Sequence, residues 1–328
     1  MRLSTFIAWL LGVGLLAALV AVNDPAQVLR AVARLRYWLL LAIVFHAVPL
    51  WLDVVAWQRL FSAPPRMLAL MRIRWIAEGV NGLLPVPHLG ELLRADLTRR
   101  ISRAGEAGAS VVVDVTLGVA TQVLFAALGI AFFALLTGGS PLLRGLVLAT
   151  AILSVGGATF YLLQRAGLFA LAAHVVRRWS SEARRRFDMD DARALDGRVR
   201  TLYARRAELF SAALWRFAGW VAGAGEIWLL LYGLGHPIGL AQAIMLESLS
   251  QAARTAAFAI PGGLGIQDGA LLVLCQQLGL GAETGLALAL AKRCRELVLG
   301  VPALLAGYVI QARRVAARAA WPDAPPPA

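Results

Sequence analysis

Charged and metal-binding side chains are scarce in this sequence. Only 16% of the 328 residues are Asp, Glu, Lys or Arg, and the chain has four histidines and two cysteines. Cys275 and Cys294 both lie in apolar sequence, with no His or Cys at the spacing of metal ligands. The sequence therefore predicts neither a disulfide framework nor a zinc site, and we interpret both cysteines as small buried hydrophobic residues. We expect no metal and no cofactor.

Familiar catalytic and nucleotide-binding motifs are missing as well. The sequence contains no Gly-x-Ser-x-Gly, Walker loop, dinucleotide fingerprint or His-Glu-x-x-His motif, so we expect neither an enzyme nor a nucleotide-driven pump within this chain. The formal net charge of +13 raises nucleic-acid binding as an alternative. Basic residues beside long apolar runs more often mark cytoplasmic loops and anionic lipid head groups, so we expect no nucleic-acid partner.

Hydrophobic residues, in contrast, make up 59% of the chain and gather in long runs. A helix needs about 20 apolar residues to cross a hydrocarbon core of about 30 Å. We predict an all-α polytopic membrane protein with about six spanning helices, at residues 3–22, 37–57, 115–143, 145–164, 209–234 and 283–311. The first run also resembles a secretory signal peptide, but no clear Ala-x-Ala site follows it.

The placement of arginine predicts the orientation. Residues 165–206 contain eleven arginines against five acidic residues, and more arginines follow residue 312. Both regions should be cytoplasmic, which places both termini of a single transmembrane domain, residues 1–312, in the cytoplasm. We expect 165–206 to form a basic amphipathic segment along the membrane surface, although a solvated helix without a function is an alternative. Residues 313–328 read as a basic, Pro-rich tail.

Two segments, about 67–100 and 241–280, are too polar and too broken to span, yet too apolar for ordinary loops. We predict that both are re-entrant helical hairpins, because non-helical backbone at membrane depth survives only inside protein or beside a watery cavity. The residues that break the helices are Pro85 and Gly90 in the first segment and Pro261, Gly262, Gly263 and Gly265 in the second. The predicted topology makes the hairpins enter from opposite sides, as in an inverted repeat. Chance similarity and eight plain crossings are the alternatives.

Ionisable residues persist in these apolar segments. A charge at the bilayer centre costs about 2.5 to 3.5 kcal/mol, so such residues usually face a cavity or a partner. We hypothesise that Arg94, Arg254 and Arg293 bind a phosphate or hydroxylated head group, oriented by Glu91 and Glu247. Internal salt bridges are the alternative. The candidate substrate-binding residues are Glu78, Asn81, His88, Glu91, Arg94, Arg216, Glu226, Glu247, Arg254, Asp268, Lys292, Arg293 and Glu296.

Four polar residues also receive simpler interpretations. Lys292 and Glu296 are one helical turn apart, so they can pair on one face. Asp53 and Asp114 lie near predicted inner helix ends, and we interpret both as interfacial residues.

The polar motifs resemble those of a known family. Asn81 with Leu84-Pro85 and Gly90-Glu91-x-x-Arg94, followed by Pro261-Gly-Gly-Leu-Gly265 and Asp268, resembles the membrane region of the lysylphosphatidylglycerol synthase/flippase family over nearly the whole chain. The stretch 247–269 is most similar to the hopanoid-biosynthesis-associated branch. The resemblance implies a lipid translocase in the inner membrane of a Gram-negative bacterium, with a hopanoid or an anionic phospholipid as its partner.

The chain departs from that family in two places. Bifunctional members carry a soluble C-terminal domain that transfers an aminoacyl group from tRNA to lipid, whereas only about seventeen residues follow Gln311 here. We do not expect that activity in this chain. Other members often have Glu where this chain has Asp268, which is one methylene shorter.

Two other functions are compatible with the sequence. One is a non-transporting scaffold that holds a lipid-biosynthesis enzyme at the membrane through residues 165–206. The other is a membrane-embedded transferase acting on a lipid-linked substrate, with Glu78 or Glu91 as its base. The sequence leaves open whether the chain forms a homo-oligomer.

Overall fold

The computed structural model describes residues 35–84, 88–103, 105–138, 142–179, 188–257 and 263–320, a few isolated positions, and side chains up to residue 313. All regular structure in these ranges is α-helical. Four of the predicted features lie outside the described residues: the first span at 3–22, and the breaks at Pro85, Pro261 and Gly262.

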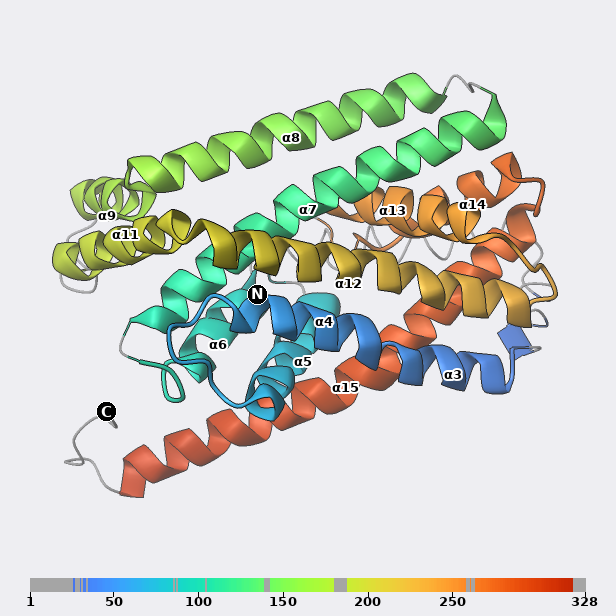
Figure 1. The fold of residues 1–328 in the computed structure, drawn as a ribbon. Coiled ribbons are helices and arrows are strands. Elements are labelled where there is room, and N and C mark those ends of the chain that lie inside the picture. The colour runs from blue at the N-terminus through green and yellow to red at the C-terminus, as the bar shows by residue number, and fades with distance from the viewer. Residues whose placement is uncertain are drawn as a thin grey trace.

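Four helical stretches in the described ranges are long and apolar enough to cross a membrane. The first, Tyr37–Gln58, consists of α3 (Tyr37–Phe45) and α4 (Ala47–Gln58), which meet at His46. The others are α7 (Glu106–Thr137), α8 (Leu142–Ala166) and residues Ala282–Arg313 of α15 (Ala282–Ala320). The chain is therefore a multi-pass membrane protein (Figure 1).

The observed helices begin and end at other residues than predicted. The helix expected at 115–143 begins at Glu106 and ends at Thr137. Gly138 follows it with a left-handed φ of 68°, which suits a residue without a side chain. The helix expected at 209–234 is α12 (Arg206–Gly233). It carries four charged residues and is not one of the four apolar stretches.

Both segments predicted as hairpins contain two helices with a break between them. The first pair is α5 (Met67–Leu83) and α6 (Leu89–Thr98), and the second is α13 (Leu240–Ala256) and α14 (Ile266–Gln277). The α5–α6 pair joins α4 and α7 at one end of the bundle, whereas α13–α14 joins α12 and α15 at the opposite end (Figure 1).

Glycines in the breaks have different physical roles. Gly263 and Gly265 have left-handed φ values of 61° and 77°, as expected for residues that reverse the chain. Gly90 was expected to make a turn but lies inside α6, where a Cβ would lie 2.2 Å from the carbonyl oxygen of Ala77. Its lack of a side chain lets α6 approach α5. The left-handed residue before α6 is His88, with a φ of 59°.

The described part of the basic segment 165–206 contains α9 (Leu168–Trp179) and α11 (Met189–Ala204), which pack against each other at one end of α7 and α8 (Figure 1). The buried Asp196 carboxylate of α11 accepts hydrogen bonds from the backbone amides of Phe169 and Ala170, 3.2 and 2.8 Å away, so it caps α9. Tyr203 donates to Gln164 of α8, and burial raises the pKa of Tyr203 to about 12. Leu171 and Val175 on α9 are exposed.

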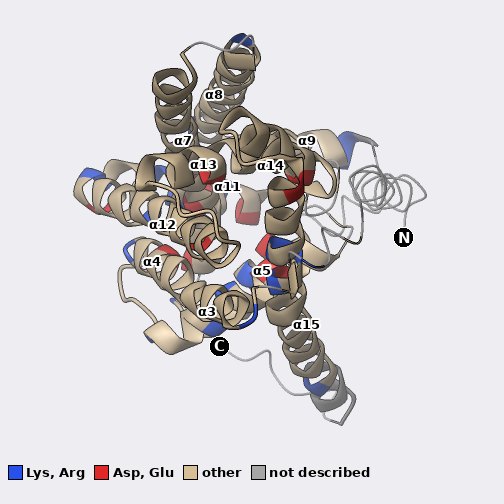
Figure 2. Cartoon of the chain, turned by 90° about the vertical axis from the view of Figure 1, so that its right-hand side faces the viewer, with Lys and Arg blue, Asp and Glu red and all other residues tan. Residues whose placement is uncertain are grey.

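The bundle places apolar side chains outside and charged ones inside. On α8, Leu148, Ile152 and Val155 are each more than 60% exposed. Viewed along the bundle, many charged ribbon segments lie inward, between α4, α5, α12 and α13 (Figure 2). Exposed apolar surface of this extent suits contact with lipid rather than water.

Candidate functional site

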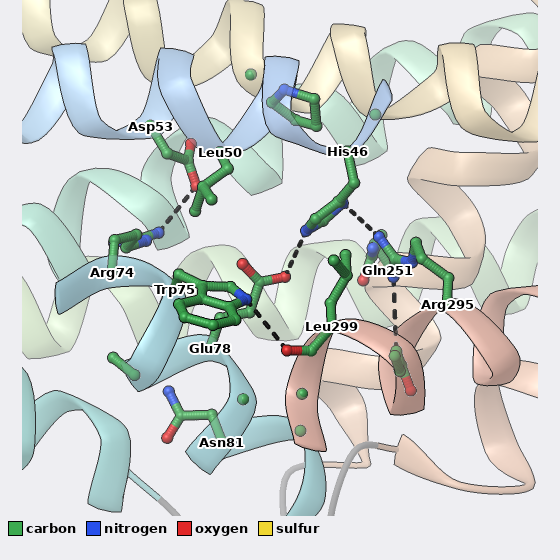
Figure 3. Close-up of a pocket in the computed structure, with 18 of the residues that line it drawn as sticks. His46, Leu50, Asp53, Arg74, Trp75, Glu78, Asn81, Gln251, Arg295 and Leu299 are labelled. Atoms are coloured by element: carbon green, nitrogen blue, oxygen red, sulfur yellow. Dashed lines mark hydrogen bonds and ion pairs between the residues drawn. The ribbon is translucent and has the colours of Figure 1, made fainter. Parts of the chain in front are cut away.

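A polar pocket of about 260 Å³ opens between α4, α5, α12, α13 and α15 (Figure 3). It brings together eight of the thirteen predicted substrate-binding residues, from both helix pairs and from α12 and α15. These are Glu78, Asn81, Glu91, Arg216, Glu226, Glu247, Arg254 and Glu296. The other five predicted residues, His88, Arg94, Asp268, Lys292 and Arg293, do not line it.

Glycines make much of the pocket wall, and some of them set helix distances. Gly79 of α5 faces Gly300 of α15, and a Cβ on Gly79 would lie 2.6 Å from the Ala303 Cβ. On α12, a Cβ on Gly219 would lie 2.8 Å from an oxygen of Asp53. Small residues let helices in membranes approach closely, and here that approach brings the polar side chains of five helices within reach of one another.

Three arginines surround one buried aspartate in what we call the Asp114 cluster. Asp114, 1% exposed, lies 2.9 Å from Arg74, 2.8 Å from Arg94 and 3.6 Å from Arg216. The remaining members of the cluster are Asp53, which bonds Arg74 and Arg216, and Glu91, which bonds Arg94. Asp53 and Asp114 both neutralise arginines inside the bundle, a role that their interpretation as interfacial residues did not include.

A second group, the His46 cluster, joins four helices at the pocket. His46 lies 2.9 Å from Glu78 of α5 through Nε2 and 2.6 Å from Glu226 of α12 through Nδ1 (Figure 3). Arg295 of α15 binds Glu226 at 2.8 Å and also reaches His46 Nδ1. The Glu78 side chain is 47% exposed, whereas that of Glu226 is 4% exposed.

A third group, the Glu296 cluster, joins α15 to the second helix pair. Glu296 lies 2.6 Å from both Arg254 and Arg293, and Arg293 binds Asp268 of α14 through two nitrogens at 3.1 Å each. Asp268 also accepts a 2.7 Å hydrogen bond from the backbone amide of Gly265, which closes the turn before α14. Asp268 therefore holds the break together instead of facing the pocket.

Lys292 pairs with a different carboxylate from the one expected. Its Nζ lies 2.5 Å from Glu247 of α13, and Glu296 is occupied by arginines. The predicted pairing of Lys292 with Glu296 is wrong, because a carboxylate on a neighbouring helix comes within reach and three arginines approach Glu296.

Two of the predicted residues, Asn81 and His88, lie near the first break. Asn81 accepts a 2.8 Å hydrogen bond from the backbone amide of Gly90 and donates to Glu91 at 3.2 Å, which closes α5 onto α6. His88 is exposed and lies outside the pocket.

The predicted set omits five polar residues of the pocket, and a signal for some of them was present. His46 and Asp53 interrupt an otherwise apolar span, as a functional intramembrane residue would. The sequence gives less indication of Arg74, Gln251 and Arg295, because Arg74 and Arg295 lie near other arginines in the sequence and Gln251 follows a polar run.

The pocket offers charge and hydrogen bonds rather than a metal centre. The described residues contain no group of three or more His, Cys, Asp or Glu side chains arranged to hold a metal ion. Arg216 lines the pocket, and its Nη1 forms ion pairs with Asp53 and Asp114, whereas its Nε is buried without a hydrogen-bond partner. Unsatisfied guanidinium donors beside carboxylates suit a visiting polar head group with both acceptors and donors.

Comparison with known proteins identifies a family. Residues 6–321 match the family model described as the lysylphosphatidylglycerol synthase TM region. A synthase catalytic domain was not found in the chain. No curated protein and no solved structure matches it significantly. With a match that covers nearly its whole length, this chain belongs to the lysylphosphatidylglycerol synthase transmembrane-region family.

Proposed function

We propose that this protein is a lipid translocase of the bacterial inner membrane. In this proposal a lipid with a polar head, such as a hopanoid or a phospholipid, passes its head through the pocket while its tails stay in the bilayer. The observation that carries the proposal is a polar pocket inside a bundle with an apolar exterior. Burying so many ionisable groups is costly for a protein that needs only a stable bundle.

The arrangement of the two helix pairs supports the same function. They join the bundle from opposite ends, and each contributes carboxylates and arginines to the pocket. We propose that both are re-entrant hairpins of an inverted repeat, as in transporters whose substrate sites lie near the membrane midplane. We further propose that the end with α9, α11 and the C-terminal part of α15 faces the cytoplasm.

The pocket also refines the proposed roles of the arginines. Arg254 lines the pocket with 26% of its side chain exposed, so it is the best placed of the three proposed head-group ligands. Arg94 is fully buried between Asp114 and Glu91, over the ring of Trp57. We therefore assign Arg94 to the stability of the bundle and propose Arg254 and Arg216 for the head group.

Reconstituted vesicles test the proposal. The purified protein is placed in phospholipid vesicles with a trace of head-group-labelled phospholipid, and a membrane-impermeant reductant reports the label in the outer leaflet. We expect the protein to speed the exchange of labelled lipid and Arg254→Gln to slow it at least tenfold, while the exposed Arg193→Gln on α11 acts like the unchanged chain. Lipids that co-purify with the protein, identified by mass spectrometry, provide further labelled substrates. Equal exchange with and without protein for all of them would contradict the proposal.

The scaffold function retains one observation in its favour. Leu171, Val175 and Val176 are exposed on α9, which is hydrogen-bonded to α11, and Arg200 of α11 donates to the Arg165 carbonyl at the end of α8. If that surface holds a lipid-biosynthesis enzyme, a Leu171→Lys and Val175→Lys double variant abolishes function in cells and leaves exchange in vesicles intact. Arg254→Gln then has little effect in cells.

A further inference from the structure

His46 lies at the junction of α3 and α4 and contacts three other helices. Its Nε2 is 2.9 Å from Oε1 of Glu78, and its Nδ1 is 2.6 Å from Oε1 of Glu226 and 2.5 Å from Nη1 of Arg295. Of the other charges on helices packed against α4, Asp53 and Asp114 are taken by the arginines of the Asp114 cluster. His46 therefore responds mainly to Glu78, Glu226 and Arg295.

The contacts of Nδ1 cannot all be hydrogen bonds at the same time. A carboxylate oxygen accepts, so its bond to Nδ1 requires a proton on that nitrogen. A guanidinium nitrogen only donates, so its bond requires the lone pair of Nδ1. The ring therefore has two arrangements: neutral, accepting from Arg295, or protonated, donating to Glu226 and Glu78. Glu226 keeps a 2.8 Å contact with Arg295 through its other oxygen in either case.

The numbers of acidic and basic side chains in each cluster also point to His46. Among the described residues, the Asp114 cluster has three carboxylates and three arginines, the Glu296 cluster has two of each, and Lys292 matches Glu247. The His46 cluster has two carboxylates and one arginine. One proton on His46 completes the balance, and its loss leaves a net negative charge in a poorly solvated site.

A route for the proton is also present. Glu78 lines the pocket and its side chain is 47% exposed, whereas His46 is 12% and Glu226 4% exposed. A proton from water in the pocket therefore meets Glu78 and His46 before it meets Glu226.

We propose that His46 is a proton-binding site and that its occupancy drives the movement of lipid through the pocket. The coupling rests on the proposed translocase function, whereas the proton site does not. In the protonation step a hydronium ion in the pocket transfers one proton to neutral imidazole: one O–H bond breaks, one N–H bond forms, and a neutral water molecule remains. The energy source assigned to transport is thus a proton gradient.

The cluster also provides a path from the proton to the second helix pair. A protonated Nδ1 no longer accepts from Arg295, so the guanidinium group shifts its bonding toward carboxylates. Its Nη2 lies 3.8 Å from Glu296, which bonds Arg254 of α13 and Arg293. Protonation makes Arg295 compete with Arg254 for Glu296, which releases Arg254 toward a head group.

Histidine NMR tests the proton site without any transport. The chain has four histidines, so protein with ¹⁵N-labelled histidine in lipid nanodiscs gives few signals, and His46→Gln identifies the one of interest. We expect this signal to change from imidazolium to neutral ring between about pH 5 and about pH 10. A signal that keeps one protonation state throughout overturns the proton site. Glu78→Gln, which removes a negative charge beside the ring, should shift the transition to lower pH. His174→Gln, on the exposed face of α9, should leave it in place.

A pH gradient across reconstituted vesicles tests the coupling. If one proton moves with each lipid, a difference of about one pH unit sustains about a tenfold difference in labelled lipid between the leaflets. His46→Gln should abolish this asymmetry, and His174→Gln should keep it. Lipid exchange that is equally fast but insensitive to the gradient overturns the coupling and leaves the proposed function intact. If His46 titrates but the protein moves none of the tested lipids, the proposed translocase function and its coupling to protons are wrong. The proton site at His46 then still stands.

Discussion

At the scale of single residues, the interior is a set of neutralised charges, and Asp114 pairs with three of its arginines. Its carboxylate faces Arg74, Arg94 and Arg216 while only 1% exposed. Breaking a buried ion pair costs about 3 to 5 kcal/mol, because the remaining charge has no partner and little water. The arginines of this cluster therefore depend on Asp114 for their own stability.

We predict that Asp114→Asn strongly destabilises the protein, since three guanidinium groups lose a shared counter-charge. The midpoint of thermal unfolding in detergent should fall by several degrees, in line with a loss of about 3 kcal/mol. Asp190→Asn is the matched control, because the Asp190 side chain is 87% exposed and its ion pair with Arg193 lies in water. Equal midpoints for the two variants would contradict the assigned role of Asp114.

The sequence predicts which residues are chemically unusual better than it predicts their partners. Glu226, Glu247 and Arg254 are recognisable because charge is rare and costly in an apolar helix. The partners depend on which helix faces which, and this is set by close contacts such as Gly219 against Asp53. Such distances leave no periodic signal in one sequence, so Lys292 was paired with its neighbour in sequence rather than with Glu247.

At the scale of helices, glycine contacts set the width of the pocket. α5 and α15 cross where Gly79 meets Gly300, and the Trp75 side chain of α5 donates a 3.1 Å hydrogen bond to the Leu299 carbonyl nearby (Figure 3). The existence of these helices follows from their apolar runs and from the Gly/Pro breaks. The position where α5 and α15 cross does not follow from the sequence, because many of its small residues could lie at such a close helix contact.

We predict that Gly79→Val forces α5 and α15 apart, because its Cβ would lie 2.6 Å from the Ala303 Cβ and 3.0 Å from the Gly300 carbonyl oxygen. Overpacking costs about 1 to 3 kcal/mol, so the unfolding midpoint should fall and lipid exchange should slow. Gly156→Val on α8 is the control, since a Cβ there has no neighbour within 4 Å. A stable, fully active Gly79→Val protein would show that the crossing tolerates separation.

At the scale of the whole molecule, basic residues gather at one end. α9, α11 and the C-terminal part of α15 share that end of the bundle, and the turns that join α12 to α13 and α14 to α15 lie at the other (Figure 1). Positively charged loops stay in the cytoplasm during insertion. The arrangement of the helices is therefore consistent with the orientation predicted from the sequence.

We predict opposite labelling of two engineered cysteines in a chain whose Cys275 and Cys294 are replaced by alanine. Arg193→Cys, on the exposed surface of α11, should react with an impermeant maleimide only after the inner membrane is opened. Glu283→Cys, exposed near the start of α15, should react in intact spheroplasts. Labelling of Arg193→Cys in intact spheroplasts would reverse the assigned orientation.

The three charge clusters also constrain how the chain is made. Besides Asp53 of α4, the Asp114 cluster has five members, which come from helices α5 to α12. All but Arg216 precede residue 115, so most of this cluster can neutralise itself while the ribosome is still synthesising the second half. The Glu296 cluster draws only on α13 to α15. Only the His46 cluster needs Arg295 beside residues made nearly 250 positions earlier. We therefore expect each half to leave the insertion machinery with its charges mostly satisfied, and closure around His46 to follow the synthesis of Arg295.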